Sequence, residues 1–244
     1  MQNYYFDYYQ YKKKINSHKT AGFSLIFFFI IILTGIAMLV YPKSKTYTEV
    51  YFVEINSFLN YKDASALANE ISALGGAGYV YYDGKYHVLA SYYPDEEDAN
   101  TVSENLLTDY PTAKVYTIEI DKVSLSNELS SSQQDCIKEQ INANEKLINS
   151  LYNTIIQYDS NNISDSEINM ILSNIKTDFS DSKDHFFELF KSDSRLNIAK
   201  KYLSKISQYV DLFDEIEDEQ NISSKLKYYL IDIVINHSSF LSAF

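Results

Sequence analysis

The chain has 244 residues and a formal net charge of -12 at pH 7, with an isoelectric point near 4.7. Nucleic-acid phosphates are bound by basic surfaces, so this acidity argues against a nucleic-acid partner. Cys136 is the only cysteine, which excludes an intramolecular disulfide and a cysteine-rich metal site. The length is sufficient for two small domains that each bury a core.

An uncharged apolar stretch at 21–41 follows a lysine-containing tail at 1–20. At about 1.5 Å of rise per residue, a helix of this length covers roughly the 30 Å core of a bilayer, so we expect a transmembrane helix. Because lysines favour the cytoplasmic side, we expect a single-pass protein of the cell membrane with a cytoplasmic tail and extracytoplasmic C-terminal domains. A cleaved signal peptide is the alternative, but the stretch exceeds the roughly 7 to 15 apolar residues typical of such signals.

The segment 47–121 predicts strands and helices in the order β-α-β-β-α-β, and its two halves match in pattern. Asp83-Gly84 is a dipeptide suited to a two-residue hairpin turn, so it should join the two middle strands. The expected elements are a strand at 47–58, a helix from Asn60 to Leu74, a hairpin at 77–93, a helix at 95–110 and a strand at 113–120.

Apolar residues in the segment 124–244 recur at steps of three and four, which indicates amphipathic helices. Clusters of Asp, Asn and Ser near 159–165, 180–184 and 218–221 should separate four or five of them. An antiparallel bundle is the simplest way to bury their apolar faces. The expected fold class is therefore α+β: an N-terminal transmembrane helix, a β-α-β-β-α-β domain and an all-α helical bundle domain.

Two stretches carry a family resemblance. Residues 51–58 (YFVEINSF), with a following helix that bears Asp63-Ala-Ser-Ala-Leu-Ala68, are similar to the opening half of SPOR domains, "V-Q-V-G-S-F … A-x-x-L". Residues 84–93 (GKYHVLASYY), followed by Glu96-Glu-Asp-Ala99, resemble the second half, "Y-R-V-x-V-G-P-F … E-A". The segment 47–121 thus resembles a SPOR domain, a module of bacterial envelope proteins that recognises septal peptidoglycan. The domain order is also similar to that of the stage II sporulation protein B type of septal protein.

The resemblance implies that glycan strands bind on the open face of the sheet. Strand alternation places Val53 and Ile55 under the two helices and leaves the neighbouring side chains on the other face. Aromatic rings there would pack on the C–H faces of sugars, and polar groups would bind hydroxyls. The candidate glycan-binding residues are Phe52, Glu54, Asn56, Ser57, Tyr79, Tyr81, His87 and Leu89.

This site has two open alternatives and five departures from the family pattern. The helical bundle or a protein partner could cover the face instead, and Ser57 could cap the helix that follows it. Glu54 stands where the family usually has Gln, and Asn56 and Ser91 replace its two glycines. Leu89 and Tyr92 replace a frequent basic residue and a proline.

We expect a non-enzymatic protein with no catalytic residues, no metal and no cofactor. His185 and Glu188 lie one helical turn apart, but no H-E-x-x-H, G-x-S-x-G or P-loop pattern accompanies them. Cys136 has no histidine nearby in sequence, and the acidic stretch 211–219 lacks the glycine of an EF-hand loop.

Two functions remain open at this point. The first is a membrane-anchored envelope protein that binds septal peptidoglycan through the SPOR-like domain, in cell division or sporulation. The second is a scaffold whose SPOR-like and helical domains bind an envelope protein partner.

Overall fold

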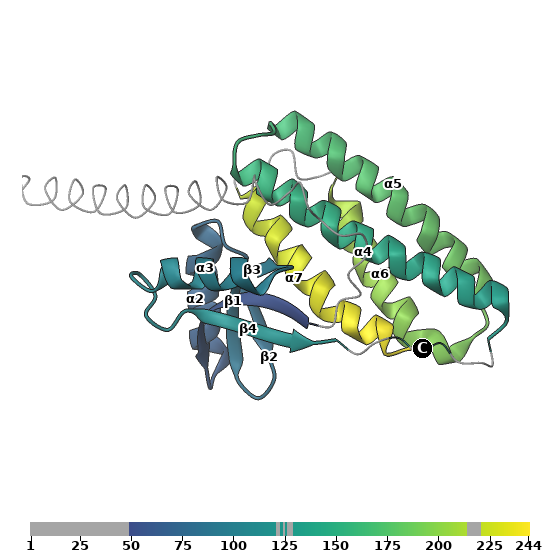
Figure 1. Cartoon of the computed structure of the whole chain (residues 1–244), viewed down its shortest axis with the longest axis horizontal. Coiled ribbons are helices and arrows are strands. Elements are labelled where there is room, and N and C mark those ends of the chain that lie inside the picture. The colour runs from purple at the N-terminus through teal and green to yellow at the C-terminus, as the bar shows by residue number, and fades with distance from the viewer. Residues whose placement is uncertain (1–48, 121–122, 124, 126–128, 214–220) are drawn as a thin grey trace, which may run out of the picture. The chain divides into compact units, whose positions relative to one another are not determined.

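The computed structural model describes residues 49–120, 123, 125, 129–213 and 221–244. These residues belong to one compact unit that begins at Ser44. The unit combines a four-stranded sheet and its two helices with a bundle of longer helices (Figure 1). The elements in chain order are β1 (Glu49–Phe58), α2 (Tyr61–Ala73), β2 (Tyr79–Tyr82), β3 (Tyr86–Tyr93), α3 (Glu96–Leu106), β4 (Lys114–Glu119), α4 (Ser131–Asp159), α5 (Asp165–Leu189), the 3-10 helix η1 (Ser194–Leu196), α6 (Asn197–Asp211) and α7 (Ile222–Leu241).

The sheet has the strand order β2-β3-β1-β4, and neighbouring strands are antiparallel. The β2–β3 hairpin pairs Tyr82 with Tyr86, so its loop contains the three residues Asp83, Gly84 and Lys85. The predicted two-residue turn is therefore wrong by one residue. Gly84 has a φ of 117°, which a side chain would oppose, so a glycine is required at this position.

Two short helices cover one face of the sheet. Asn60 caps α2 by accepting from the Asp63 backbone N–H at 3.0 Å, and Asp95 caps α3 in the same way through Glu97. Their apolar sides pack toward the sheet residues that alternation assigned to this face. The buried residues on this side include Val53, Ile55, Ala64, Ala68, Ile71, Val88, Ala99 and Val102.

The bundle contains two long helices, each started by a capping box. Ser130 begins α4 with Gln133, and Ser164 begins α5 with Glu167. The predicted break at 180–184 is wrong, because α5 continues to Leu189. That segment contains no Pro or Gly, and the continuous helix keeps Phe179 and Phe186 on one buried side, two turns apart.

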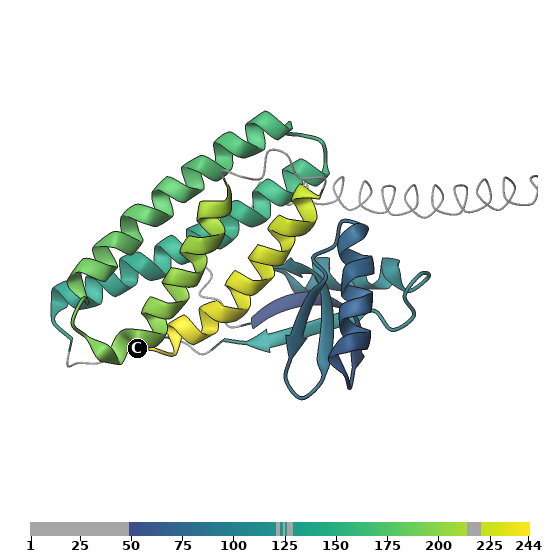
Figure 2. The ribbon, with the colours of Figure 1, turned by 180° about the vertical axis from the view of Figure 1, so that it is seen from behind.

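The four long helices pack in sequence, and α7 closes the bundle against α4. Figures 1 and 2 both show α7, in yellow, as the bundle helix next to the sheet. It contacts β2, β3 and α2. One hydrophobic cluster includes Phe52, Leu89 and Tyr92 of the sheet together with bundle residues such as Leu151 and Leu230, so the two regions share a core.

The expected transmembrane helix at 21–41 lies outside the described residues. In the part of the chain that the structure describes, no helix is both long and apolar enough to cross a bilayer. Over the described residues the expected fold class is therefore corrected to α+β without a transmembrane helix, and the single-pass membrane localisation that depended on that helix is withdrawn.

Candidate functional site

The second face of the sheet, opposite α2 and α3, contains most of the predicted site residues, and half of it is covered. Phe52 and Leu89 have no exposed surface and Tyr92 is 4% exposed, since they pack into the core shared with the bundle. Tyr79 is also engaged, because its hydroxyl donates to Asp232 Oδ1 of α7 at 2.6 Å. In this half of the face the helical bundle covers the sheet, as one of the alternatives from the sequence proposed. We call it the covered half.

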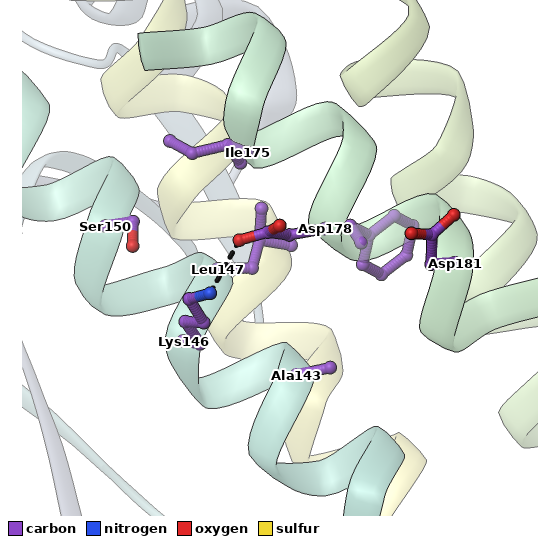
Figure 3. Close-up of a pocket in the computed structure, with 8 residues that line it drawn as sticks. Ala143, Lys146, Leu147, Ser150, Ile175, Asp178 and Asp181 are labelled. Atoms are coloured by element: carbon purple, nitrogen blue, oxygen red, sulfur yellow. Dashed lines mark hydrogen bonds and ion pairs between the residues drawn. The ribbon is translucent and has the colours of Figure 1, made fainter.

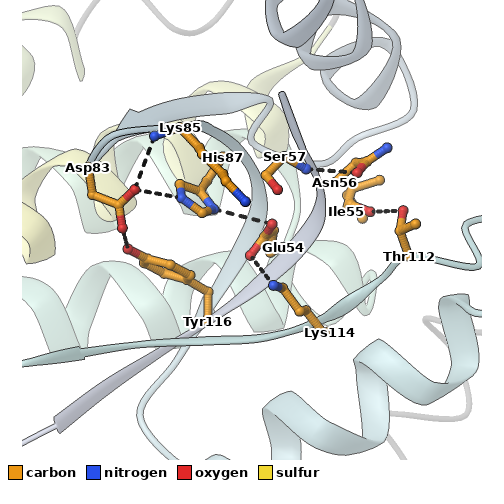
Figure 4. Close-up of polar contacts among 10 residues, drawn as sticks. All are labelled: Glu54, Ile55, Asn56, Ser57, Asp83, Lys85, His87, Thr112, Lys114 and Tyr116. Atoms are coloured by element: carbon orange, nitrogen blue, oxygen red, sulfur yellow. Dashed lines mark hydrogen bonds and ion pairs between the residues drawn. The ribbon is translucent and has the colours of Figure 1, made fainter. Parts of the chain in front are cut away.

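The other half of the face ends at the β2–β3 hairpin and contains a group of polar and aromatic side chains. We call this group the hairpin-end cluster, and Figure 4 shows all of its members except Tyr81. Its members come from the four strands and the hairpin loop: Glu54 of β1, Tyr81 of β2, Asp83 of the loop, His87 of β3, and Lys114 and Tyr116 of β4.

His87 lies at the centre of the cluster, between two carboxylates. Its Nδ1 is 3.2 Å from Glu54 Oε1, and its Nε2 is 2.7 Å from Asp83 Oδ1. The contact with Asp83 is a hydrogen bond, whereas the contact with Glu54 is at ion-pair distance without hydrogen-bond geometry and is an ion pair only when the imidazole is protonated. Lys114 Nζ, 3.5 Å from Glu54 Oε2, brings a positive charge to this carboxylate.

Glu54 needs these neighbours because its side chain is only 1% exposed. An isolated buried carboxylate is costly, whereas one that faces cationic partners is tolerated. The Lys114 side chain is 60% exposed, so the network connects a buried charge with the solvent.

Asp83 anchors the outer end of the network. Its Oδ2 accepts from the Tyr116 hydroxyl at 2.6 Å. This hydrogen bond, assisted by His87 and opposed by burial, holds the pKa of Asp83 below its ordinary value. Burial, and then the hydrogen bond to Asp83, raise the pKa of Tyr116, so this hydroxyl remains a donor.

Aromatic rings surround the imidazole. The His87 ring centroid lies 4.6 Å from that of Tyr116 and 6.4 Å from that of Tyr81, and the two tyrosine rings are 5.8 Å apart. Both tyrosines are partly exposed. The cluster therefore offers ring surface, an ammonium group and a carboxylate, all held in place by hydrogen bonds and ion pairs.

An irregularity in β1 changes the face of two predicted residues. The pairing with β3 shifts between Glu54 and Asn56, so that Asn56 pairs with Val88 and Ser57 with His87. An extra residue reverses strand alternation, which places Asn56 on the helix-covered face and brings Ser57 to the face of His87. Thr112 stabilises the shifted backbone by donating to the Ile55 carbonyl at 2.8 Å.

The structure thus divides the predicted set into three groups. Glu54, Tyr81 and His87 come together in the cluster, with Ser57 on the same face. Phe52, Tyr79 and Leu89 belong to the covered half, and Asn56 lies on the opposite face.

Sequence reasoning missed Asp83, Lys114 and Tyr116. Alternation in 113–120 does place Lys114 and Tyr116 on one face, which is a usable signal. Their partners depend on β4 pairing with β1, where Lys114 lies opposite Glu54, and the strand order was not evident from local pattern.

A hollow of about 270 Å³ lies between α4 and α5, away from the sheet (Figure 3). Leu147, Ile175 and Phe179 contribute apolar lining, and Lys146 Nζ contacts Asp178 Oδ2 at 2.6 Å. Both members of this ion pair are more than half exposed, so water screens the pair. The hollow lacks the buried polar groups that orient a ligand at the sheet.

Cys136 and His185, which the sequence offers as candidates for catalysis, have different surroundings in the described structure. Cys136 is buried, and burial raises the pKa of its thiol to about 11. His185 is exposed and lies 3.4 Å from Glu139 of α4. Among the described residues, no group of three or more His, Cys, Asp or Glu side chains is placed to hold a metal ion.

Comparisons of the chain with protein-family models, curated proteins and solved structures found no match.

Proposed function

We propose that this protein is a non-enzymatic binding protein that holds glycan strands of septal peptidoglycan at the hairpin-end cluster, in cell division or sporulation. The observation that carries the proposal is the partly exposed ring surface of Tyr81 and Tyr116 beside the fixed charges of Asp83 and Lys114. The SPOR resemblance supplies the ligand class.

The chemistry of the cluster suits a saccharide. Tyrosine rings pack on the C–H faces of sugar rings, and the hydroxyl of Tyr116 holds its ring in place by donating to Asp83. Asp83 can accept from sugar hydroxyls, and the Lys114 ammonium can bind the carboxylates of the peptidoglycan lactyl and peptide groups. The buried ion pairs hold these groups in position, which lowers the entropy lost on binding.

The test is sedimentation of the purified protein with intact and with amidase-treated cell-wall sacculi. Tyr81→Ala should weaken sedimentation severalfold, because a ring contact contributes about 1 kcal/mol. Tyr82→Ala is a matched control, since Tyr82 is the next residue of β2, lies on the opposite face and is 59% exposed. If both variants sediment as well as the unaltered protein, the hairpin-end cluster is not the glycan-binding site. If the unaltered protein does not sediment, the protein does not bind peptidoglycan glycan strands.

One observation favours the second function, a scaffold that binds an envelope protein partner. The bundle already occupies half of the sheet face through apolar contacts, so this face is suited to protein surfaces as well. Under that hypothesis the unaltered protein would not sediment with sacculi.

A further inference from the structure

The contact between α7 and the sheet has a different character from the rest of the core, because charged and polar groups are buried in it. Lys227 is 7% exposed, donates to the Gly75 carbonyl at 2.8 Å and contacts Asp159 Oδ2 at 2.7 Å. Ser224 donates to the Gly76 carbonyl at 2.7 Å. These contacts hold α7 against the turn between α2 and β2.

A second contact lies further along α7. Asp232 is 4% exposed and accepts from Tyr79 of β2, from Tyr209 of α6 at 2.9 Å and from Lys205 of α6 at 2.8 Å. Its carboxylate therefore joins the sheet to two helices of the bundle.

Buried ion pairs and hydrogen bonds gain little net free energy over their hydrated forms, because water replaces the lost partners when they separate. Interfaces between domains that separate are accordingly more polar than the core of a single domain. The α7 contact combines an apolar part, which belongs to the shared core, with these buried polar and charged groups, whereas the core under α2 and α3 is built mainly from Ala, Val, Ile and Leu.

The covered half and the hairpin-end cluster are parts of one continuous face. Tyr79 and Tyr81 are two residues apart on β2, and Leu89 and His87 lie opposite them on β3. A polymer bound at Tyr81 and Tyr116 that continued along β2 and β3 would meet α7, because α7 contacts both strands.

We propose that α7 is a removable cover, and that a glycan strand and α7 compete for the covered half of the sheet face. This inference rests on the proposed glycan function, and it states that the position of α7 regulates glycan binding. Opening releases the contacts of Ser224, Lys227 and Asp232 with the sheet domain, and it adds the ring of Tyr79, which packs on Tyr228 of α7, to the ring surface available at Tyr81.

A disulfide can lock the cover in place. The hydroxyl oxygens of Ser72 and Ser224 are 2.7 Å apart, so cysteines at these positions lie within reach of each other. In the full chain carrying Ser72→Cys and Ser224→Cys, oxidation should remove most of the sedimentation with sacculi, and reduction should restore it. The Ser72→Cys single variant is the control for the oxidant and for the native Cys136. Equal sedimentation of the locked and reduced forms would overturn the competition.

A second readout measures opening without any ligand. Ser224 is 2% exposed and Cys136 is 3% exposed, but Cys136 lies on α4 within the bundle. In the Ser224→Cys variant, a thiol reagent should modify the new thiol at position 224 about tenfold faster than Cys136. Each modification rate is first divided by the rate of the same thiol in the unfolded chain. The difference is expected because α7 opens locally more often than the whole protein unfolds. Equal normalised rates would show that the cover does not open separately. Fast modification without sedimentation of either form would show that the cover opens and that the glycan function fails.

Discussion

The two faces of the sheet are buried by different means. On the face of α2 and α3, small and β-branched residues such as Ala64, Ala68, Val53 and Ile55 pack closely, and the covering helices are the next elements along the chain. On the other face, α7 lies about 130 residues from the strands that it covers, and it brings Lys227 and Asp232 into the contact. The first face is packed mainly by small and β-branched apolar residues, whereas the second combines an apolar part of the shared core with buried polar and charged groups.

This difference determines which face of the sheet can bind a ligand. A core of small apolar residues leaves no polar group to orient a ligand, whereas the second face already holds Glu54, His87 and Asp83 in a fixed network. The following variants test this contrast in order of expected effect.

Asp232→Ala should have the largest effect, because it leaves three donors without their shared acceptor. Losing one member of a buried charged network typically lowers the free energy of unfolding by about 4 kcal/mol. Urea unfolding measures this, and a double-mutant cycle with Tyr79→Phe isolates the sheet contact. Asp211→Ala is the control, since that side chain is 68% exposed. Equal stability of the two variants would contradict the interface described for α7.

Ile55→Ala should lower the free energy of unfolding by about 3 kcal/mol, because it removes a side chain that is 1% exposed from the core under α2 and α3. Ile198→Ala, at a residue that is 55% exposed, should change it by less than about 0.5 kcal/mol. Thermal unfolding of both variants provides the comparison. A small loss for Ile55→Ala would mean that this core adjusts to the cavity.

His237 predicts a dependence of stability on pH that arises in the bundle. Burial lowers its pKa from 6.5 to about 4, and Tyr202 is its hydrogen-bond partner at 3.3 Å. Between these values the unfolded chain binds a proton that the folded protein does not. The free energy of unfolding should therefore fall as the pH drops from 6.5 toward 4, by roughly 2–3 kcal/mol, and this contribution should be constant above that range.

His237→Leu should remove that part of the pH dependence in urea titrations at pH 4.5 and pH 7. His185→Leu should retain it, since that side chain is 60% exposed. A pH dependence that is unchanged in His237→Leu would assign the effect to other groups.

Tyr116→Phe should have the smallest effect on stability. It removes one hydrogen bond to Asp83, whose side chain is 41% exposed, so we expect a loss of about 0.5 kcal/mol at pH 7. Because the folded pKa of Asp83 is lowered, this contribution is present above the unfolded pKa and disappears as the pH falls through the folded pKa. Tyr82→Phe, which keeps an exposed ring, is the control. A loss of more than about 2 kcal/mol would show that Tyr116 supports the fold itself.

Local chemistry was enough to predict several elements from the sequence. Asn60 and Asp95 start helices because their side chains accept backbone N–H groups that have no partner within the helix. The apolar stripes of 124–244 indicated helices because the 3.6-residue period is imposed by the helix itself. Of the candidate site, Glu54, Tyr81 and His87 were recognised because alternation is a property of each strand.

The remaining features required the tertiary structure, because they depend on contacts between distant segments. The register of β1 against β3 shifts between Glu54 and Asn56. Because this shift depends on the partner strand, strand alternation alone assigned Asn56 to the wrong face. Lys114 and Tyr116 joined the site only because β4 pairs with β1. The sequence showed that α7 is amphipathic, but which surface it covers was decided by the fit of Ser224, Lys227 and Asp232 to the sheet domain. Local sequence thus determined the elements, whereas long-range pairing and packing decided which of their faces meet.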